Sequence, residues 1–247
     1  MCRHAAWLGA ARPLTWLIHE PEHGLLTQSY APRRQQQGLI NADGYGMGWY
    51  DPARPEPMRY RRTVPIWTDA NLPALAQVAR STCLLAAVRS ATVGMPIEES
   101  ATAPFTDRTW LLSHNGRVAR DALRGLADDL AEDLAGDLAD RAESTCDAAW
   151  VAAAVFLRGR AGAGLGEALA EVVVRAGAKD PAARLNLLAC DGASIAATVW
   201  GDTLFHRRLP DGVLVASEPL DDLPGWQAVP EHSLLTVTPT DVRVQPL

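Results

Sequence analysis

The second residue of the chain, Cys2, could supply a nucleophile and a base at the same position. If Met1 is removed, Cys2 carries both a thiol and a free α-amino group. The unperturbed pKa of a cysteine thiol is about 8.5 and that of an α-amino group is about 8, so the amine can accept the thiol proton near neutral pH. An N-terminal nucleophile activated in this way attacks carbonyl carbon in acyl-transfer reactions. A cysteine at position 2 also occurs without any such role, so the rest of the chain must decide.

Two later segments could complete an acyl-transfer site. CLLAAVRSAT (83–92) is typical of a buried strand and ends in Arg89, a buried charge that needs a partner in a ligand or in the protein. TWLLSH (109–114) predicts another buried strand, which delivers Asn115 and Gly116. A side-chain amide and an adjacent backbone N–H can stabilise an oxyanion. The alternatives are a structural ion pair for Arg89 and an ordinary turn for Asn-Gly.

These segments resemble class II glutamine amidotransferase domains of the N-terminal nucleophile hydrolase superfamily. The resemblance rests on MCRH at the start, AAVRSAT at the end of one strand and W-x-x-x-HNG in another. It implies that Cys2 is the catalytic nucleophile and that Arg89 binds the α-carboxylate of the substrate. It also implies that Asn115 and Gly116 form the oxyanion hole.

The same resemblance implies further substrate-binding residues. Asp147, in STCDAAW near the start of a later helix, would bind the α-ammonium group. Thr92 belongs to the same R-x-A-T motif as Arg89. His114 either orients the Asn-Gly segment or is a core histidine with a structural hydrogen bond. The loop 93–107 is a candidate lid or wall for the leaving group, because loops of that length are often functional.

A longer ordered set of blocks, including QSYAPRRQ, NADGYGMGWY, RLNLLA, TVWGDTLF and VLVASEP, narrows the resemblance. It is similar to the hydrolases that remove glutamate from γ-glutamyl-hercynylcysteine S-oxide in ergothioneine biosynthesis. Two departures from the wider amidotransferase pattern are Ala103-Pro104-Phe105, where a histidine-proline element is common, and Ala149, where an acidic residue is common. With no synthase domain expected, the alternatives are hydrolysis of glutamine or of another γ-glutamyl amide, or an inactive binding or regulatory protein.

The resemblance implies an α+β fold, a four-layer αββα sandwich with two antiparallel sheets between helical layers. We expect one domain over residues 1–247, with the mature chain starting at Cys2. The sequence pattern is compatible with this order: strands first, including a strand pair at 58–68, then helices, then an antiparallel series that includes the hairpin at Asp191-Gly192. The sequence predicts helices over residues 13–20, 70–80, 119–142, 148–157 and 165–176. The helix at 119–142 is acidic, and Ser144 or Thr145 is the expected N-cap of the helix at 148–157.

Composition limits the other functional classes. The net charge of −6 argues against a nucleic-acid groove, and no apolar run approaches the roughly 20 residues that span a bilayer. No signal peptide is visible, so we expect a cytoplasmic protein. The four cysteines show no metal-ligand spacing, and we expect no metal and no cofactor; Cys83 and Cys190 are predicted as small core residues. The three glycines at 44, 46 and 48 indicate close backbone packing rather than a phosphate loop. The oligomeric state is left open.

Overall fold

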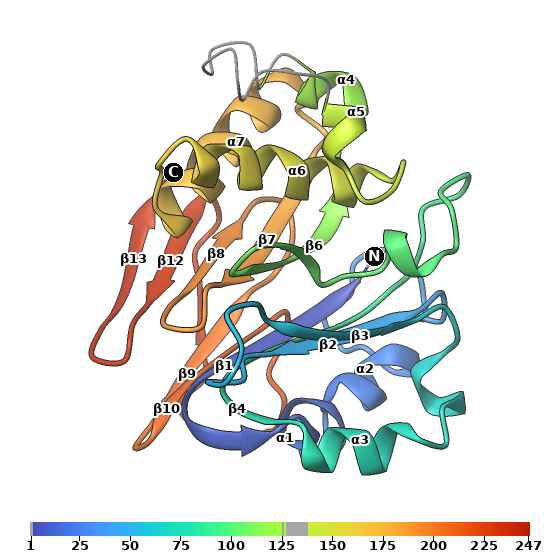
Figure 1. The fold of residues 1–247 in the computed structure, drawn as a ribbon, viewed down its shortest axis with the longest axis vertical. Coiled ribbons are helices and arrows are strands. Elements are labelled where there is room, and N and C mark those ends of the chain that lie inside the picture. The colour runs from blue at the N-terminus through green and yellow to red at the C-terminus, as the bar shows by residue number, and fades with distance from the viewer. Residues whose placement is uncertain (1, 125, 127–137) are drawn as a thin grey trace.

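Two antiparallel β-sheets form the centre of the structure, and helices cover the outer face of each sheet (Figure 1). This computed structural model describes residues 2–124, 126 and 138–247. The layers follow the order helix, sheet, sheet, helix, which confirms the four-layer αββα arrangement and the α+β class.

The first sheet has seven strands in the order β11-β9-β10-β1-β4-β2-β3. Its central strands are long and apolar because they are covered on both faces, by helices on one side and by the second sheet on the other. The strands of this sheet are β1 (Arg3–Pro13), β2 (Tyr45–Trp49), β3 (Met58–Arg62), β4 (Arg80–Val88), β9 (Phe205–Leu209), β10 (Gly212–Ala216) and β11 (Gln227–Ala228).

The second sheet has six strands in the order β13-β12-β8-β7-β6-β5. The strands of this sheet are β5 (Phe105–Asp107), β6 (Trp110–Arg117), β7 (Arg184–Cys190), β8 (Ile195–Val199), β12 (Ser233–Val237) and β13 (Val242–Pro246). β7 and β8 form the hairpin predicted at Asp191-Gly192. The C-terminal strands do not form one continuous series, because β9 to β11 join the first sheet whereas β12 and β13 join the second.

Helices pack on the outer faces in two groups. α1 (Thr15–Ile18), α2 (Leu25–Tyr30) and α3 (Leu72–Val78) cover β1 and its neighbours in the seven-stranded sheet. α6 (Asp147–Arg160) and α7 (Leu165–Lys179) cover the six-stranded sheet. The inner face of α7 buries apolar residues at helical spacing, such as Leu165, Leu169 and Val172, as an amphipathic helix requires. Two short helices, α4 (Arg120–Leu123) and α5 (Leu138–Arg141), and two 3-10 turns, η1 (Ile66–Thr68) and η2 (Glu99–Ala101), complete the described chain.

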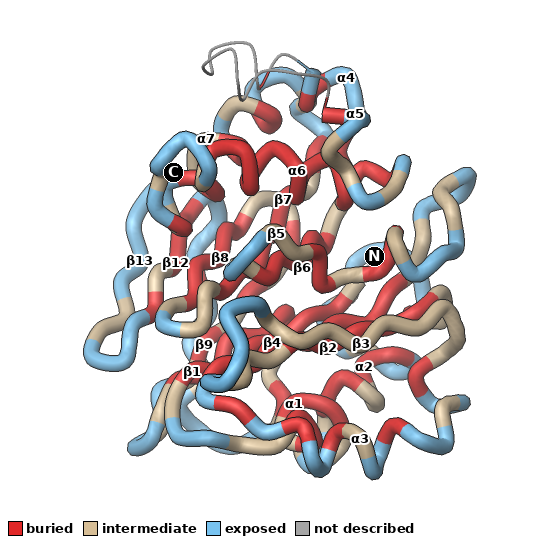
Figure 2. The backbone as a smooth tube through the Cα atoms, viewed as in Figure 1, coloured by how far each residue is buried: buried red, intermediate tan, exposed pale blue. Residues whose placement is uncertain are grey.

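Between the sheets lies a core of small and branched side chains. The strands that carry them are coloured as buried in Figure 2. Ala6 and Leu8 of β1 point into this core, whereas Ala5 and Trp7 point toward the helices, as the two-residue period of a strand requires. Cys83 and Cys190 are fully buried in the same inter-sheet core, which confirms their prediction as core residues.

Two predictions of local structure need correction, and a third falls partly outside the described residues. Residues 58–68 form one strand, β3, followed by a 3-10 turn, because Pro65 interrupts the pattern. The N-cap of α6 is Cys146, not Ser144 or Thr145. Half of the acidic helix predicted at 119–142 falls on residues 125 and 127–137, which lie outside the described residues; α4 and α5 flank them.

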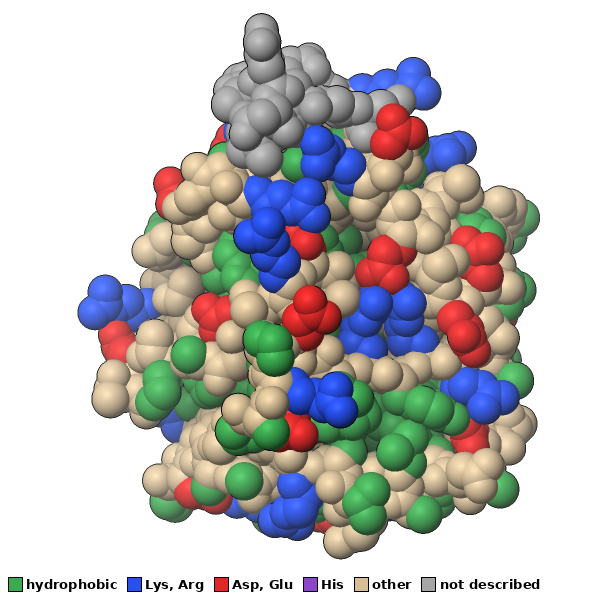
Figure 3. All heavy atoms as spheres, in the orientation of Figure 1, with side chains coloured by type: hydrophobic (Ala, Val, Ile, Leu, Met, Phe, Trp, Pro, Cys, Tyr) green, Lys and Arg blue, Asp and Glu red, His purple; other side chains and the backbone are tan. Residues whose placement is uncertain are grey.

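The glycines of β2 serve close packing, as predicted. A Cβ at Gly46 would lie 2.1 Å from the carbonyl oxygen of Ala103, so only glycine allows this approach. On the face shown in Figure 3, basic and acidic side chains are interspersed. Among the described residues, no helix has both the length and the apolar composition that crossing a bilayer requires.

Candidate active site

The register of β1 with β4 brings Cys2 next to Arg89. Arg3 pairs with Val88 in this antiparallel ladder, so the residues just beyond each strand, Cys2 and Arg89, face one another. Cys2 is half-buried, and its Sγ lies 3.9 Å from the carbonyl oxygen of Ser90. Cys2 and Arg89 line one pocket together with Ser113, His114 and part of the predicted wall segment, residues 101–103 and 105.

Arg89 is a buried guanidinium whose hydrogen bonds are incomplete. Its Nη2 donates to the carbonyl oxygen of Pro96 at 2.9 Å, while its buried Nη1 has no partner among the described residues. The exposed Glu98 interacts with Arg89 only weakly: hydrogen bonds from Ser144 and Ser100 and, to a lesser extent, the charge of Arg89 lower the pKa of that carboxyl. No ion pair to Arg89 occurs in the described part of the chain, so the predicted alternative of a structural ion pair lacks its acid.

Asn115 and Gly116 lie inside strand β6 rather than after it. β6 runs on to Arg117, and Asn115 pairs with Asn186 of β7. A Cβ at Gly116 would lie 1.9 Å from the carbonyl oxygen of Arg184, so close backbone contact requires glycine there. The expected strand end at 114, and the alternative of a turn, are both wrong, because the ladder with β7 continues through the Asn-Gly dipeptide.

Asp147 is the first residue of α6 and is almost fully buried. One carboxylate oxygen accepts the backbone N–H of Val118 at 3.0 Å, and the other accepts that of Ala148 at 2.9 Å. The carboxylate thus fixes the chain segment after β6 to the start of the helix, where a negative charge is also favoured by the helix dipole. Ala148, not Asp147, lines the pocket with Cys2, so binding of an ammonium group by Asp147 stays a prediction.

Thr92 and His114 differ in their positions. Thr92 is exposed in the turn after Arg89 and does not line the pocket with Cys2. His114 does line it, and its Nε2 lies 2.9 Å from the carbonyl oxygen of Arg184. This contact is the structural hydrogen bond of one of the two predicted alternatives for His114, and it helps to position Arg184, whose carbonyl oxygen lies against Gly116.

Comparison with known proteins identifies the family. No family model matches the sequence. A gamma-glutamyl-hercynylcysteine sulfoxide hydrolase of Mycolicibacterium smegmatis is 50% identical over 250 aligned positions, which cover 100% of both chains. The protein of the same name from Mycobacterium tuberculosis is 49% identical, over 100% of this chain and 97% of its own length. The chain belongs to the gamma-glutamyl-hercynylcysteine sulfoxide hydrolase family.

Solved structures agree with this family assignment at the level of the fold. A glutamine aminotransferase class-II domain protein from Silicibacter pomeroyi superposes with a TM-score of 0.67 and 25% identity over 99% of both chains. Glutamine phosphoribosylpyrophosphate amidotransferase from B. subtilis has a TM-score of 0.69 and 14% identity, over 100% of this chain and 49% of its own. The resemblance to class II glutamine amidotransferases is therefore confirmed for the fold.

In this member of the hydrolase family, two buried charged residues that hydrogen bonds link to Cys2 were not predicted from the sequence. Arg3 and Asp202 are fully buried and form an ion pair, with Arg3 Nη2 2.7 Å from Asp202 Oδ2. Arg3 Nε also donates to the carbonyl oxygen of Cys2 at 2.7 Å. A signal was present: Arg3 stands close before the apolar run AAWLGAA (5–11), and a charge buried with such a run needs a partner.

His4 is a third buried polar residue near Cys2. Its Nδ1 lies 3.1 Å from Ser113 Oγ, and its backbone N–H donates to Ser217 Oγ at 3.0 Å. Burial, and to a lesser extent the charges of Arg3 and His114, lower the pKa of His4 to about 3. The imidazole is therefore neutral at physiological pH and does not add a positive charge beneath the nucleophile.

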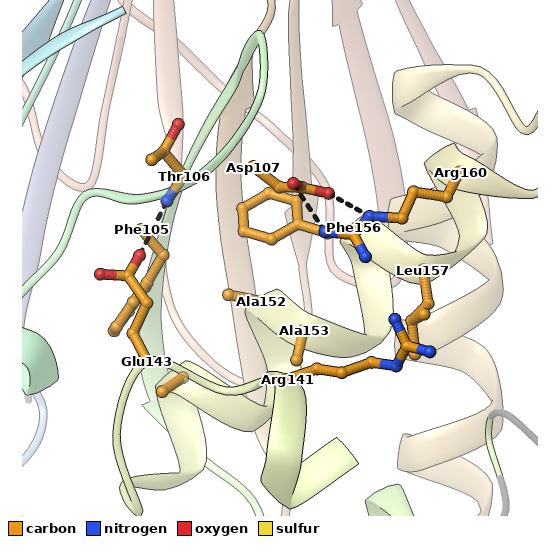
Figure 4. A pocket seen from close by; sticks show the side chains of 11 residues that line it. Phe105, Thr106, Asp107, Arg141, Glu143, Ala152, Ala153, Phe156, Leu157 and Arg160 are labelled. Atoms are coloured by element: carbon orange, nitrogen blue, oxygen red, sulfur yellow. Dashed lines mark hydrogen bonds and ion pairs between the residues drawn. The ribbon is translucent and has the colours of Figure 1, made fainter. Parts of the chain in front are cut away.

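A second hollow is lined by β5, α6 and the end of α5, and Cys2 is not among its lining residues (Figure 4). Asp107 and Arg160 form a two-pronged ion pair across it, with both N–O distances at 2.8 Å. Glu143 accepts the backbone N–H of Thr106 and also pairs with Arg59. The charges of Asp107, Arg160 and Glu143 in this hollow are thus paired within the protein, whereas the guanidinium of Arg89 is incompletely hydrogen-bonded.

Proposed function

We propose that this protein hydrolyses the γ-glutamyl amide bond of γ-glutamyl-hercynylcysteine sulfoxide and releases glutamate and hercynylcysteine sulfoxide. Relatives of that name match the chain over its full length at about half identity. The observation that carries the proposal is the buried guanidinium of Arg89, which lacks an acid partner within the described residues and shares a pocket with Cys2. The α-carboxylate of a glutamyl group is the partner that such a guanidinium needs.

In this proposal Arg89 and Asp147 hold the glutamyl head. A guanidinium can bind a carboxylate through two parallel hydrogen bonds, which fixes both the position and the orientation of the substrate. Nη1 of Arg89 is free to form one of these bonds. Asp147 would contribute negative charge for the α-ammonium group, on the side of the pocket that Ala148 lines. Anchoring the head presents the γ-carbonyl to Cys2 at reacting distance.

The reaction then takes two acyl-transfer steps. The α-amine of Cys2, free once Met1 is removed, takes the thiol proton, and the thiolate attacks the γ-carbonyl carbon. The oxyanion accepts hydrogen bonds from Asn115 Nδ2 and the Gly116 N–H. When the C–N bond of the amide breaks, the α-ammonium group of Cys2 gives its proton to the leaving amine. Water then attacks the thioester and gives a proton to the α-amine of Cys2. When the C–S bond breaks and glutamate leaves, that proton returns to the Cys2 thiolate.

The test is a comparison of substrates with one quantified product. Purified protein is first checked by mass spectrometry for loss of Met1, and glutamate release is then measured with γ-glutamyl-hercynylcysteine sulfoxide and, separately, with glutamine. We expect a higher kcat/KM for the sulfoxide, and no release by Cys2→Ala. Preference for glutamine would overturn the substrate assignment, and retained Met1 in fully active protein would overturn the role of the Cys2 amine.

A further inference from the structure

We infer that Asp202 is a positioning residue that ties the nucleophile to the oxyanion donor. The inference rests on the proposed function, in which Cys2 attacks and Asn115 stabilises the oxyanion. Its basis is a single carboxylate oxygen, Asp202 Oδ2, which accepts hydrogen bonds from Arg3 Nη2 at 2.7 Å and from Asn115 Nδ2 at 3.1 Å.

The network runs without a break from the nucleophile to the oxyanion donor. Arg3 Nε donates to the carbonyl oxygen of Cys2, its Nη2 donates to Asp202, and the same oxygen of Asp202 holds the Asn115 amide. Arg3, Asp202 and Asn115 have no or almost no exposed surface. In a site that excludes water, these hydrogen bonds keep more of their strength than they would on the surface, so the spacing of the two groups is held tightly.

Asp202 also decides which end of the Asn115 amide faces it. A carboxylate accepts hydrogen bonds and donates none, so the NH₂ end of the amide must point to Asp202. Nδ2 carries two hydrogens, and within the described residues it makes only this one hydrogen bond. The second hydrogen has no partner among the described residues, and in the proposed function it is the one that the oxyanion accepts. Without the carboxylate, the amide could rotate and present its oxygen, which would repel the developing negative charge.

The position of Asp202 in the chain explains how it reaches both sheets. It lies in the connection between β8, in the six-stranded sheet, and β9, in the seven-stranded sheet. Asn186 of β7 fixes this crossing, because its Nδ2 donates to the carbonyl oxygens of Asp202 and Thr203 and its Oδ1 accepts the N–H of Trp200. The backbone N–H of Thr203 holds the second carboxylate oxygen of Asp202 at 2.7 Å.

The test is a double-mutant cycle on glutamate release. Asn115→Ala alone is expected to lower kcat by about 10²–10³-fold, as loss of one oxyanion donor does. Asp202→Asn keeps the shape but replaces an acceptor oxygen by a donor, and we expect a loss of about 10²-fold in kcat with little change in KM. If Asp202 acts through Asn115, the double variant is slower than Asn115→Ala by no more than about threefold. Asp211→Asn, the same substitution in the exposed ion pair with Arg12, is the matched control and should leave kcat unchanged.

A second measurement separates positioning from damage to the nucleophile. Alkylation of Cys2 by iodoacetamide forms no oxyanion, so Asp202→Asn should change its rate by less than about threefold while kcat falls. If Asp202→Asn does not fold, Arg3→Met/Asp202→Leu leaves no unpaired buried charge and must show the same loss in kcat. The inference is wrong if the losses in kcat of Asn115→Ala and Asp202→Asn multiply in the double variant. It is also wrong if Arg3→Met/Asp202→Leu has the wild-type kcat. A near-normal kcat in Asn115→Ala would instead refute the proposed oxyanion role.

Discussion

Replacing Arg89 by methionine should lower activity without lowering stability, whereas replacing a buried residue usually lowers stability. The substitution removes a guanidinium whose Nη1 is buried without a partner and keeps a long apolar stem in its place. A structural arginine contributes to folding, so its loss destabilises the protein. An arginine held ready for a substrate carboxylate costs folding energy in the free enzyme, so its loss should do the opposite.

The magnitude follows from the contacts of Arg89. Leaving a buried donor without a partner costs about 1–3 kcal/mol. The hydrogen bond from Nη2 to the Pro96 carbonyl would be lost, at a net cost of about 1 kcal/mol, since that carbonyl lies in a partly exposed loop and can bind water. The balance is an unchanged or increased free energy of unfolding, by up to about 2 kcal/mol.

Activity should fall at the same time. Two charge-assisted hydrogen bonds to the substrate carboxylate are together worth about 3–4 kcal/mol, which corresponds to a loss of about 10²–10³-fold in kcat/KM. Arg89→Lys keeps the charge but not the planar fork, so it should recover only part of this loss. Glutamate, the product, should raise the unfolding temperature of the wild type and not that of Arg89→Met, because ligand stabilisation requires binding.

Urea denaturation and glutamate-release kinetics on the same preparations provide the two readings. Arg160→Met is the matched control: it breaks the ion pair with Asp107 away from Cys2, and it should lower stability slightly while leaving kcat/KM unchanged. A loss of more than about 2 kcal/mol in Arg89→Met would show that the guanidinium is a structural support for the loop at Pro96. A kcat/KM within about threefold of the wild type would refute the carboxylate-binding role.

Three further predictions concern Cys2, Gly116 and His4. Cys2→Ala should unfold at the wild-type temperature and bind substrate, yet any turnover by it would end the thiol mechanism. Gly116→Ala places a Cβ 1.9 Å from the Arg184 oxygen, so we expect a loss of about 1–3 kcal/mol in stability, seen as a lower Tm, together with a lower kcat; an unchanged Tm would contradict it. Because the pKa of His4 is lowered from 6.5 to about 3, only the unfolded state binds its proton between those values, so stability falls as pH drops through that window, by about 2 kcal/mol at pH 5. Urea denaturation at pH 8 and pH 5 should show this extra loss relative to His4→Gln.

The sequence was most informative where one pattern determined one structure. Apolar runs bounded by turn residues correctly predicted β4, β7 and β8. The Asp191-Gly192 turn correctly predicted the hairpin that joins β7 and β8. Short-range patterns did less well at boundaries. Strand β6 continues through Asn115 and Gly116 because its ladder with β7 overrides the turn preference of that dipeptide.

Which residues surround Cys2 could be predicted only in part. Of the predicted site residues, Arg89 and His114 line the pocket with Cys2, whereas Thr92, Asn115, Gly116 and Asp147 are not among its lining residues. The partner of Arg3 could not be predicted, because Asp202 lies 199 positions away and no local pattern reports a contact of that separation. A charge next to an apolar run indicates that a partner exists, but only the fold shows which residue the partner is.

The separation of Arg3 and Asp202 in sequence also shows why a sandwich suits this chemistry. The seven-stranded sheet carries Cys2 and, through the register of β1 with β4, sets Arg89 beside it. The six-stranded sheet carries Asn115 on β6. A slip of one residue in either ladder would turn these side chains to the opposite faces. Alignment between the sheets needs a further constraint, since their core consists of nondirectional apolar contacts. Asp202, on the segment that crosses from one sheet to the other, supplies a directional bond to each.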